Sequence, residues 1–202
     1  MRLSLLIFLL FSLSGCAIFP GSNEISHLQH WYLDIPLEKP NFVSDGPSIS
    51  VAMPRSPSLL DNTAIYYRQT PHRIEPYAHN LWSAAPAEML QPLLINQLES
   101  SGFFSVVLAA PEAALSSPLR LETELLRLYQ DYQQQPSQIV LALRAQLLDV
   151  GQQRVLGSQL FQIKLPTQTD DMQGGVTAMN QAIGQLLKQL RLFVIQHLTE
   201  AA

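Results

Sequence analysis

The sequence predicts an α+β fold, in which a mixed, largely antiparallel sheet carries two main helices packed on one face. Three observations lead to this prediction. Residues 119–166 contain three strands of alternating apolar and polar side chains, joined by polar turns. Residues 83–101 and 173–198 repeat apolar side chains at helical spacing. The order of strands, helix, strand, meander and helix lacks the regular alternation of a parallel α/β sheet.

Four short apolar runs precede the first helix and predict strands. In the second of them Ile49, Val51 and Met53 alternate with small side chains, which is the pattern of a half-buried strand. Pro76 is expected to end the fourth run, because proline donates no hydrogen bond to a strand ladder. The four runs are residues 31–35, 48–53, 64–68 and 73–75.

The first helix is predicted over residues 83–101. Ser83 suits the N-cap, Pro86 suits the first turn, and Gly102 suits the C′ position after the helix. Pro92 conflicts with this prediction, because a proline inside a helix removes a hydrogen bond at a cost of about 3 kcal/mol. Two alternatives remain: the helix bends at Pro92, or it starts later than Ser83.

A strand over residues 103–109 and a loop follow this helix and lead into the meander. Within the first meander strand the apolar phase slips by one residue after Leu125, which predicts a β-bulge. The second helix, residues 173–198, has an apolar stripe that is expected to cover the sheet. Asp170 and Asp171 precede this helix and favour its positive amino-terminal end.

The first sixteen residues have the pattern of an export signal. A positive start at Met1-Arg2 precedes an apolar run over residues 3–13, which is shorter than the roughly 20 residues of a membrane-spanning helix. The sequence Leu13-Ser14-Gly15-Cys16 then resembles the bacterial lipobox. This resemblance implies cleavage between Gly15 and Cys16, attachment of a diacylglycerol to the Cys16 thiol, and acylation of the new amino group with palmitate. The alternatives are a signal-anchor helix, or an ordinary secretory signal with a cysteine present by chance.

The signal divides the chain into three predicted parts. They are a signal peptide over residues 1–15, a lipidated cysteine with a flexible tether over residues 16–30, and a single α+β periplasmic domain over residues 31–202. Several acyl chains make a firm anchor, whereas a single one holds only marginally. Position 17 is Ala rather than the Asp that tends to retain such lipoproteins in the inner membrane. The resemblance therefore implies the outer membrane, with the domain on its periplasmic face.

Composition argues against several classes of protein. The chain has 202 residues, one cysteine and a formal net charge of −4. It therefore lacks the cysteines of a disulfide framework or a multi-cysteine zinc site, and the clustered positive charge of a nucleic-acid-binding protein. None of the common catalytic or nucleotide-binding motifs occurs in it. We expect neither an enzyme nor a cofactor or metal, although a serine–histidine–aspartate triad depends on geometry and stays open.

Two groups of side chains have both a functional and a structural interpretation. His27 and His30 lie three residues apart and would share a face if the tether were helical. Two ligands are too few for a structural zinc site, so solvated side chains are expected. A group of aromatic residues before the first helix suits either a partner surface or core packing with hydroxyls at the rim, and the second is favoured. The aromatic residues are Tyr66, Tyr67, Tyr77 and Trp82.

Five short motifs occur in a particular order along the chain. They are Trp31-Tyr32-Leu33, SISVAMPRSPSLLD over residues 48–61, Ile65-Tyr66-Tyr67-Arg68, LWSAAP over residues 81–86, and LESSGFFSV over residues 98–106. In this order they resemble the ABC-type transport auxiliary lipoprotein family, including the PqiC-like group (paraquat-inducible protein C). An extra Ala shifts the small residues that precede the proline of the fourth motif.

This resemblance implies a non-catalytic periplasmic subunit of an intermembrane transport system. Such lipoproteins accompany an inner-membrane transporter and a periplasmic MCE-domain protein that carries lipid or other hydrophobic cargo between membranes. The chain would dock that assembly at the outer membrane, and whether it forms a homo-oligomer is left open. Two other hypotheses fit the lipobox: an assembly factor or pilotin-like chaperone of another envelope machine, and a lipid-anchored hydrolase.

Overall fold

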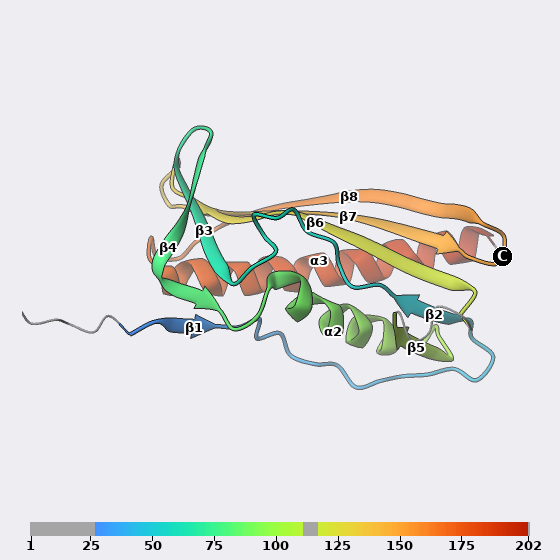
Figure 1. Cartoon of the computed structure of the whole chain (residues 1–202). Coiled ribbons are helices and arrows are strands. Elements are labelled where there is room, and N and C mark those ends of the chain that lie inside the picture. Colours follow the sequence, from blue (N-terminus) through green and yellow to red (C-terminus); the bar gives the residue numbers. More distant parts are fainter. Residues whose placement is uncertain (1–26, 111–116, 202) are drawn as a thin grey trace, which may run out of the picture.

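The computed structural model describes residues 27–110 and 117–201, and within them eight strands form one sheet and two helices pack on it (Figure 1). The predicted signal peptide, Cys16 and most of the predicted tether lie outside these residues. The elements are β1 (Gln29–Trp31), β2 (Ser48–Val51), β3 (Ala64–Thr70), β4 (Arg73–Trp82), α2 (Pro86–Glu99), β5 (Val106–Ala109), β6 (Leu119–Asp131), β7 (Gln138–Asp149), β8 (Arg154–Pro166) and α3 (Met172–Ala201).

Both helices cover the same face of the curled sheet, so the predicted α+β class is confirmed (Figure 1). α3 packs against β7 and β8, and α2 packs against β2 and β5. The predicted apolar stripe of α3 is buried, and Met179, Ile183, Leu186 and Leu190 are fully enclosed. Burial of each such side chain contributes about 1.5–3 kcal/mol, so the contact of α3 with the sheet is a main source of stability.

β6, β7 and β8 form the predicted antiparallel meander. β7 is paired along its whole length on both edges, with β6 on one side and β8 on the other. The register of β6 against β7 shifts between Leu125 and Arg127, so the predicted bulge is confirmed. An extra residue at this point bends β6 and changes which side chains face outward beyond it.

The second edge of β6 is shared between two shorter strands. β2 pairs in parallel with residues 119–121, and β3 pairs in parallel with residues 130–131. Between these strands Arg55 bridges to Glu124. In the described part of the chain no strand pairs on this edge with residues 126–129. The sheet therefore has a gap beside the β-bulge.

The predicted bounds of β1 and β4 are wrong. β1 covers Gln29–Trp31 rather than residues 31–35, because its partner is the end of β4, with which it pairs in parallel. β4 continues through Pro76 to Trp82 instead of ending at the proline. Within the described part of the chain, β1 pairs only with the last three residues of β4, so the edge at Pro76 has no ladder there for the proline to interrupt.

β2 also differs from its predicted half-buried pattern. Ile49 and Val51 are buried as expected, but Ser50 is buried too and Met53 is exposed. β2 lies between β5 and β6, and Ser50 Oγ donates a hydrogen bond to the Leu119 carbonyl, which satisfies the polar side chain inside the fold. The strand after α2 is shorter than predicted, since β5 begins at residue 106 and not at residue 103.

α2 begins at Pro86 rather than at Ser83. Its N-cap, Ala85, has an extended backbone with φ −57° and ψ 141°, as expected because a proline disfavours the helical conformation of the residue before it. Ser83 instead donates its backbone N–H to the Trp31 carbonyl at 2.7 Å. The helix therefore starts later than Ser83, but Pro92 still lies inside it, so the later start alone does not remove the conflict posed by Pro92.

The end of α2 also lies inside the predicted range. The helix continues through the exposed Pro92 and ends at Glu99, with Ser100 as the C-cap. Gly102 has a φ of +68°, a left-handed conformation that favours glycine, and lies two residues beyond that cap. Among the described residues, no helix is long and apolar enough to cross a membrane.

Candidate functional site

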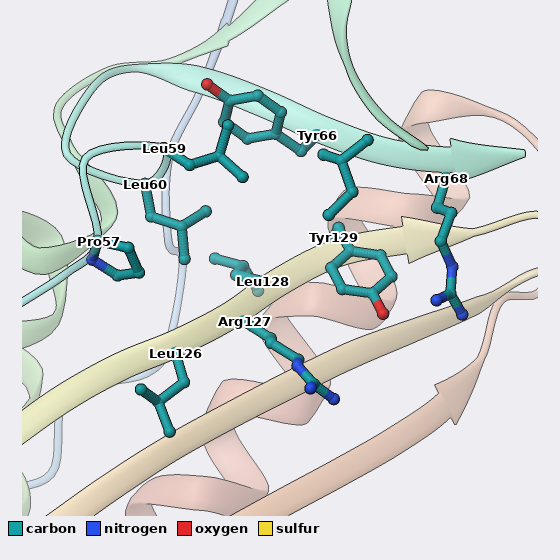
Figure 2. A pocket seen from close by; sticks show the side chains of 10 residues that line it. Pro57, Leu59, Leu60, Tyr66, Arg68, Leu126, Arg127, Leu128 and Tyr129 are labelled. Atoms are coloured by element: carbon teal, nitrogen blue, oxygen red, sulfur yellow. The ribbon is translucent and has the colours of Figure 1, made fainter. Parts of the chain in front are cut away.

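A cavity of about 320 Å³ lies at the gap beside the β6 bulge, and we call it the β3–β6 cavity (Figure 2). The chain that links β2 to β3 follows β6 as far as Arg55 and then turns away, with a hydrogen bond from Leu60 N–H to the Pro57 carbonyl. This detour leaves space above β6. The lining consists of Pro57, Leu59, Leu60, Tyr66, Arg68, Ile74, Leu126, Arg127, Leu128 and Tyr129.

Most of the lining is apolar, and part of it is open to solvent. Leu60 and Leu128 belong to the buried core and form the inner wall. Leu59 and Ile74 also line the cavity and are 44% and 38% exposed, so part of its apolar lining faces solvent. Exposed apolar surface costs free energy in water, and an apolar opening is therefore typical of a binding site.

Two guanidinium groups stand among these apolar side chains, on either side of the Tyr129 ring in Figure 2. Arg68 forms an ion pair with Asp131 and lies 5.2 Å from the centre of the Tyr129 ring. Burial raises the pKa of Asp131, but its bonds to Arg68 and to the Gln133 N–H outweigh burial and hold that pKa below its usual value. Among the described residues no carboxylate lies within 4.0 Å of the exposed Arg127.

A buried polar network fixes the end of the sheet next to the cavity. Tyr77 Oη donates to Gln130 Oε1 at 2.9 Å and lies 2.7 Å from Tyr132 Oη. Gln130 Nε2 in turn donates to Ser137 Oγ. Burial, and then the bond to Tyr132, raise the pKa of Tyr77, so its hydroxyl stays protonated and available as a donor. The network holds the β3–β4 hairpin against the meander.

The segment between β1 and β2, residues 32–47, forms a strap across both helices. Asn96 on α2 exchanges two 2.9 Å hydrogen bonds with the backbone of Glu38. Asn180 on α3 accepts a 2.6 Å bond from the Asp34 N–H. A hollow of about 520 Å³ lies beside the strap, and its lining carries Asp34, Glu38 and Lys188, so that it has charges of both signs.

Within the described part of the chain, the structure does not bring together the residues that the sequence singled out for lipid attachment or metal binding. Cys16 and Gly15 lie outside the described residues. His27 and His30 are exposed, and His30 belongs to β1, so the helical spacing that would bring them together is absent from this segment. The described residues include no group of three His, Cys, Asp or Glu side chains placed to hold a metal ion.

The aromatic residues before α2 belong mainly to the core, as favoured from the sequence. Trp82 is 1% exposed and Tyr66 8%. Tyr67 and Tyr77 are half-buried and their hydroxyls bond to Glu75 and Gln130. Tyr66 has a second role that the sequence did not indicate, because its side chain also lines the β3–β6 cavity.

The sequence of residues 34–191 matches the model of a family described as the ABC-type transport auxiliary lipoprotein component. The chain belongs to this family. It is thus an auxiliary lipoprotein of an ABC-type transport system. Membership of this lipoprotein family indicates a membrane-anchored location in the cell envelope. The resemblance drawn from the five motifs is confirmed by this match.

Two solved structures have the same fold as this auxiliary lipoprotein. Protein XCC0632 from Xanthomonas campestris, of the DUF330 family, is 22% identical, with a TM-score of 0.76 over 86% of this chain and 98% of that one. An uncharacterized protein is 16% identical, with a TM-score of 0.66 over 83% of this chain and 99% of that one. A comparison with curated proteins finds no significant match.

Sequence reasoning about this auxiliary lipoprotein missed the cavity itself. Arg68 belongs to one of the five motifs and Arg127 to none of them, and nothing local in the sequence marks either as lining a cavity. One signal was present: the slip in apolar phase after Leu125 marks the bulge that forms one wall. Two of the motifs that carried the resemblance, over residues 48–61 and 65–68, supply half of the lining.

Proposed function

We propose that this chain is a non-catalytic outer-membrane lipoprotein of an intermembrane lipid transport system, which docks an MCE-domain protein and its inner-membrane ABC transporter at the outer membrane. The observation that carries the proposal is the family match over residues 34–191, to an auxiliary component of ABC-type transport. The PqiC-like order of motifs adds the MCE protein as the partner and a lipid or other hydrophobic molecule as the cargo.

The lipobox supports the proposed anchor. Cys16 is the only cysteine of the chain and occupies the position at which the lipobox requires one. Residues 17–26 separate it from the first described residue, and ten residues can extend over at most about 35 Å. Lipid chains on Cys16 would therefore keep the folded part of the chain close to the membrane, where a docking subunit has to be.

Residue 17 supports the outer membrane as the location. It is Ala, and the Asp that tends to retain lipoproteins in the inner membrane is absent there. The acidic charge of the chain gives no electrostatic attraction to an anionic lipid surface, so the lipid chains would supply the attachment.

Co-purification from the native membrane tests the proposed partner. The full chain, tagged at its carboxyl terminus and expressed from its own locus, is extracted in mild detergent and its partners are identified by mass spectrometry. We expect an MCE-domain protein and components of an ABC transporter. An unrelated outer-membrane lipoprotein with the same tag is the control. Recovery of a secretin or a barrel-assembly protein instead would favour the pilotin-like alternative, and recovery of no MCE protein would contradict the proposal.

A further inference from the structure

The β3–β6 cavity combines apolar walls with positive charge. Among the described residues, its lining includes two arginines but no aspartate or glutamate, although the chain as a whole is acidic. Other hollows differ in this respect: the one beside the strap carries Asp34, Glu38 and Lys188, and another carries Arg120, Glu122 and Asp149. The charge in the β3–β6 cavity is therefore selective for an anion.

The two arginines are not equivalent. The charge of Arg68 is balanced by Asp131 at 2.6 Å, so Arg68 shapes the wall and adds little net attraction. Arg127 is exposed, and no described carboxylate lies within ion-pair distance of it. A guanidinium group binds carboxylate and phosphate through paired hydrogen bonds. Arg127 is thus the group that would hold an anionic head.

The remainder of the lining fits a tail without polar groups. Apart from two tyrosine hydroxyls, the other side chains are proline, leucine and isoleucine, which offer no polar group to a ligand. A volume of about 320 Å³ lies at the lower end of the range of small-molecule sites. Leu59 and Ile74 line the cavity and are also exposed, so a longer chain could extend past them into solvent or toward a partner.

We infer that the β3–β6 cavity binds an anionic amphiphile, with an acyl chain against Leu59, Leu126 and Leu128 and its carboxylate or phosphate at Arg127. This inference deepens the proposed function, on which it rests for the choice of lipid as the natural ligand. A free fatty acid and an anionic phospholipid share this chemistry, and the test below separates them.

Photolabelling of the intact lipoprotein tests the inference. The full-length processed chain is placed in phosphatidylcholine nanodiscs and exposed to a diazirine-bearing hexadecanoic acid, to the matching alcohol, or to phosphatidylglycerol with the same chain. Labelled residues are located by peptide mass spectrometry. We expect labels from the acid, from phosphatidylglycerol or from both, at residues 57–60 and 126–129. Whichever anionic probe labels identifies the source of the ligand, and the alcohol should label about tenfold less.

Two pairs of variants separate charge from general surface effects. Arg127→Gln should reduce labelling by the acid about tenfold, whereas Arg154→Gln, at an exposed arginine on β8, should leave it unchanged. Leu59→Glu should abolish labelling, and Leu192→Glu, at a leucine of α3 that is 65% exposed, should not. All four positions are exposed, so each variant is expected to fold, and melting temperature checks this.

Three outcomes would overturn the inference: labels at other residues only, equal labelling by the alcohol, or no effect of Arg127→Gln. Protection of residues 126–129 by an acidic peptide but not by the fatty acid would also overturn it and would identify a protein ligand instead. Co-purification with the MCE protein is measured on the same Arg127→Gln chain. If labelling fails while the MCE protein is still recovered from wild type, the lipid site is wrong and the proposed function stands. If labelling succeeds while no MCE protein is recovered, the lipid site stands and the proposed function is wrong.

Discussion

Arg68 and Asp131 form a two-pronged ion pair across the junction of β3 and β6. Nη2 of Arg68 lies 2.6 Å from Oδ2 of Asp131, and Nε lies 3.2 Å from Oδ1. The two residues are register partners in the parallel β3–β6 ladder, and the Asp131 side chain is only 3% exposed. Because the pair closes the sheet immediately beyond its gap, it sets one wall of the β3–β6 cavity.

Removal of the arginine should destabilise the fold strongly. Arg68→Ala leaves the buried Asp131 carboxylate without its counter-charge, and we expect the free energy of unfolding to fall by about 3 kcal/mol. Urea unfolding followed by circular dichroism measures this. Arg144→Ala is the matched control, since Arg144 bonds Glu124 at 2.9 Å on the exposed face and should contribute less than about 1 kcal/mol. Equal effects of the two substitutions would contradict this account of the pair.

The same pair should make stability depend on acid. The folded-state pKa of Asp131 is lowered, so its contribution is complete from about pH 5 upward, well above its unfolded value of about 3.9, and is lost as the pH falls from there toward the lowered pKa. We expect the stability difference between wild type and Asp131→Asn to be largest near pH 7 and to shrink below pH 4. Asp170 and Asp171 also have lowered pKa values, but they are present in both proteins and cancel in the difference. A difference that stays constant from pH 7 to pH 3 would contradict the prediction.

Local periodicity was sufficient to predict the meander strands and α3. Each of these elements buries one continuous face and is long enough to show the repeat of its apolar side chains. The bulge after Leu125 was predicted for the same reason. The bounds of β1, β4 and α2 were not, since they depend on partners far away in the chain. Gln29–Trp31 becomes a strand because the end of β4 pairs with it, and Pro76 is tolerated because no described strand pairs with that edge of β4.

The β3–β6 cavity was less accessible to sequence reasoning than the fold. It forms where two strands share one edge of β6, and parallel pairing of β2 and β3 with residues more than sixty positions later leaves no mark in local periodicity. Arg127 follows the bulge directly, but a lone arginine in a strand is usually a solvated side chain. Only the fold shows that Arg127 lines the same cavity as the apolar side chains of Leu59 and Ile74.

Two glycines of α3 should respond oppositely to the same substitution. A Cβ at Gly175 would collide with the Gln130 amide, which is buried and bonded to Tyr77 and Ser137. Gly175→Ala should therefore lower the free energy of unfolding by about 1–2 kcal/mol despite the better helix propensity of alanine. At Gly184 a Cβ meets nothing within 4 Å, and Gly184→Ala should raise stability by about 0.5–1 kcal/mol. Thermal unfolding of the two variants is the measurement, and a stabilised Gly175→Ala would show that the polar network has room to yield.

The strap should be released when its contact with α2 is removed. Asn96→Ala deletes the two hydrogen bonds to the Glu38 backbone, and we expect a loss of about 1–2 kcal/mol. Hydrogen exchange of peptides from residues 36–43 should accelerate, while exchange in β7 should change little. Gln189→Ala, at an exposed position of α3, is the control. Unchanged exchange in the strap would mean that its other contacts, such as Arg191 with Glu38, are sufficient to hold it.

Substitution of the single cysteine separates anchoring from folding. Cys16→Ser removes the thiol to which the proposed diacylglycerol is attached, and cleavage before residue 16 should then fail. We expect a chain that keeps residues 1–15, carries no acyl groups and is absent from the outer-membrane fraction. The fold should persist, because the packed core lies within residues 33–194 and involves no cysteine. Intact-mass measurement, membrane fractionation and circular dichroism check the three expectations, with Ser14→Ala, which keeps a small residue in the lipobox, as the control. Normal outer-membrane fractionation of Cys16→Ser would contradict the anchor, whereas loss of the fold would show that the thiol has a structural role.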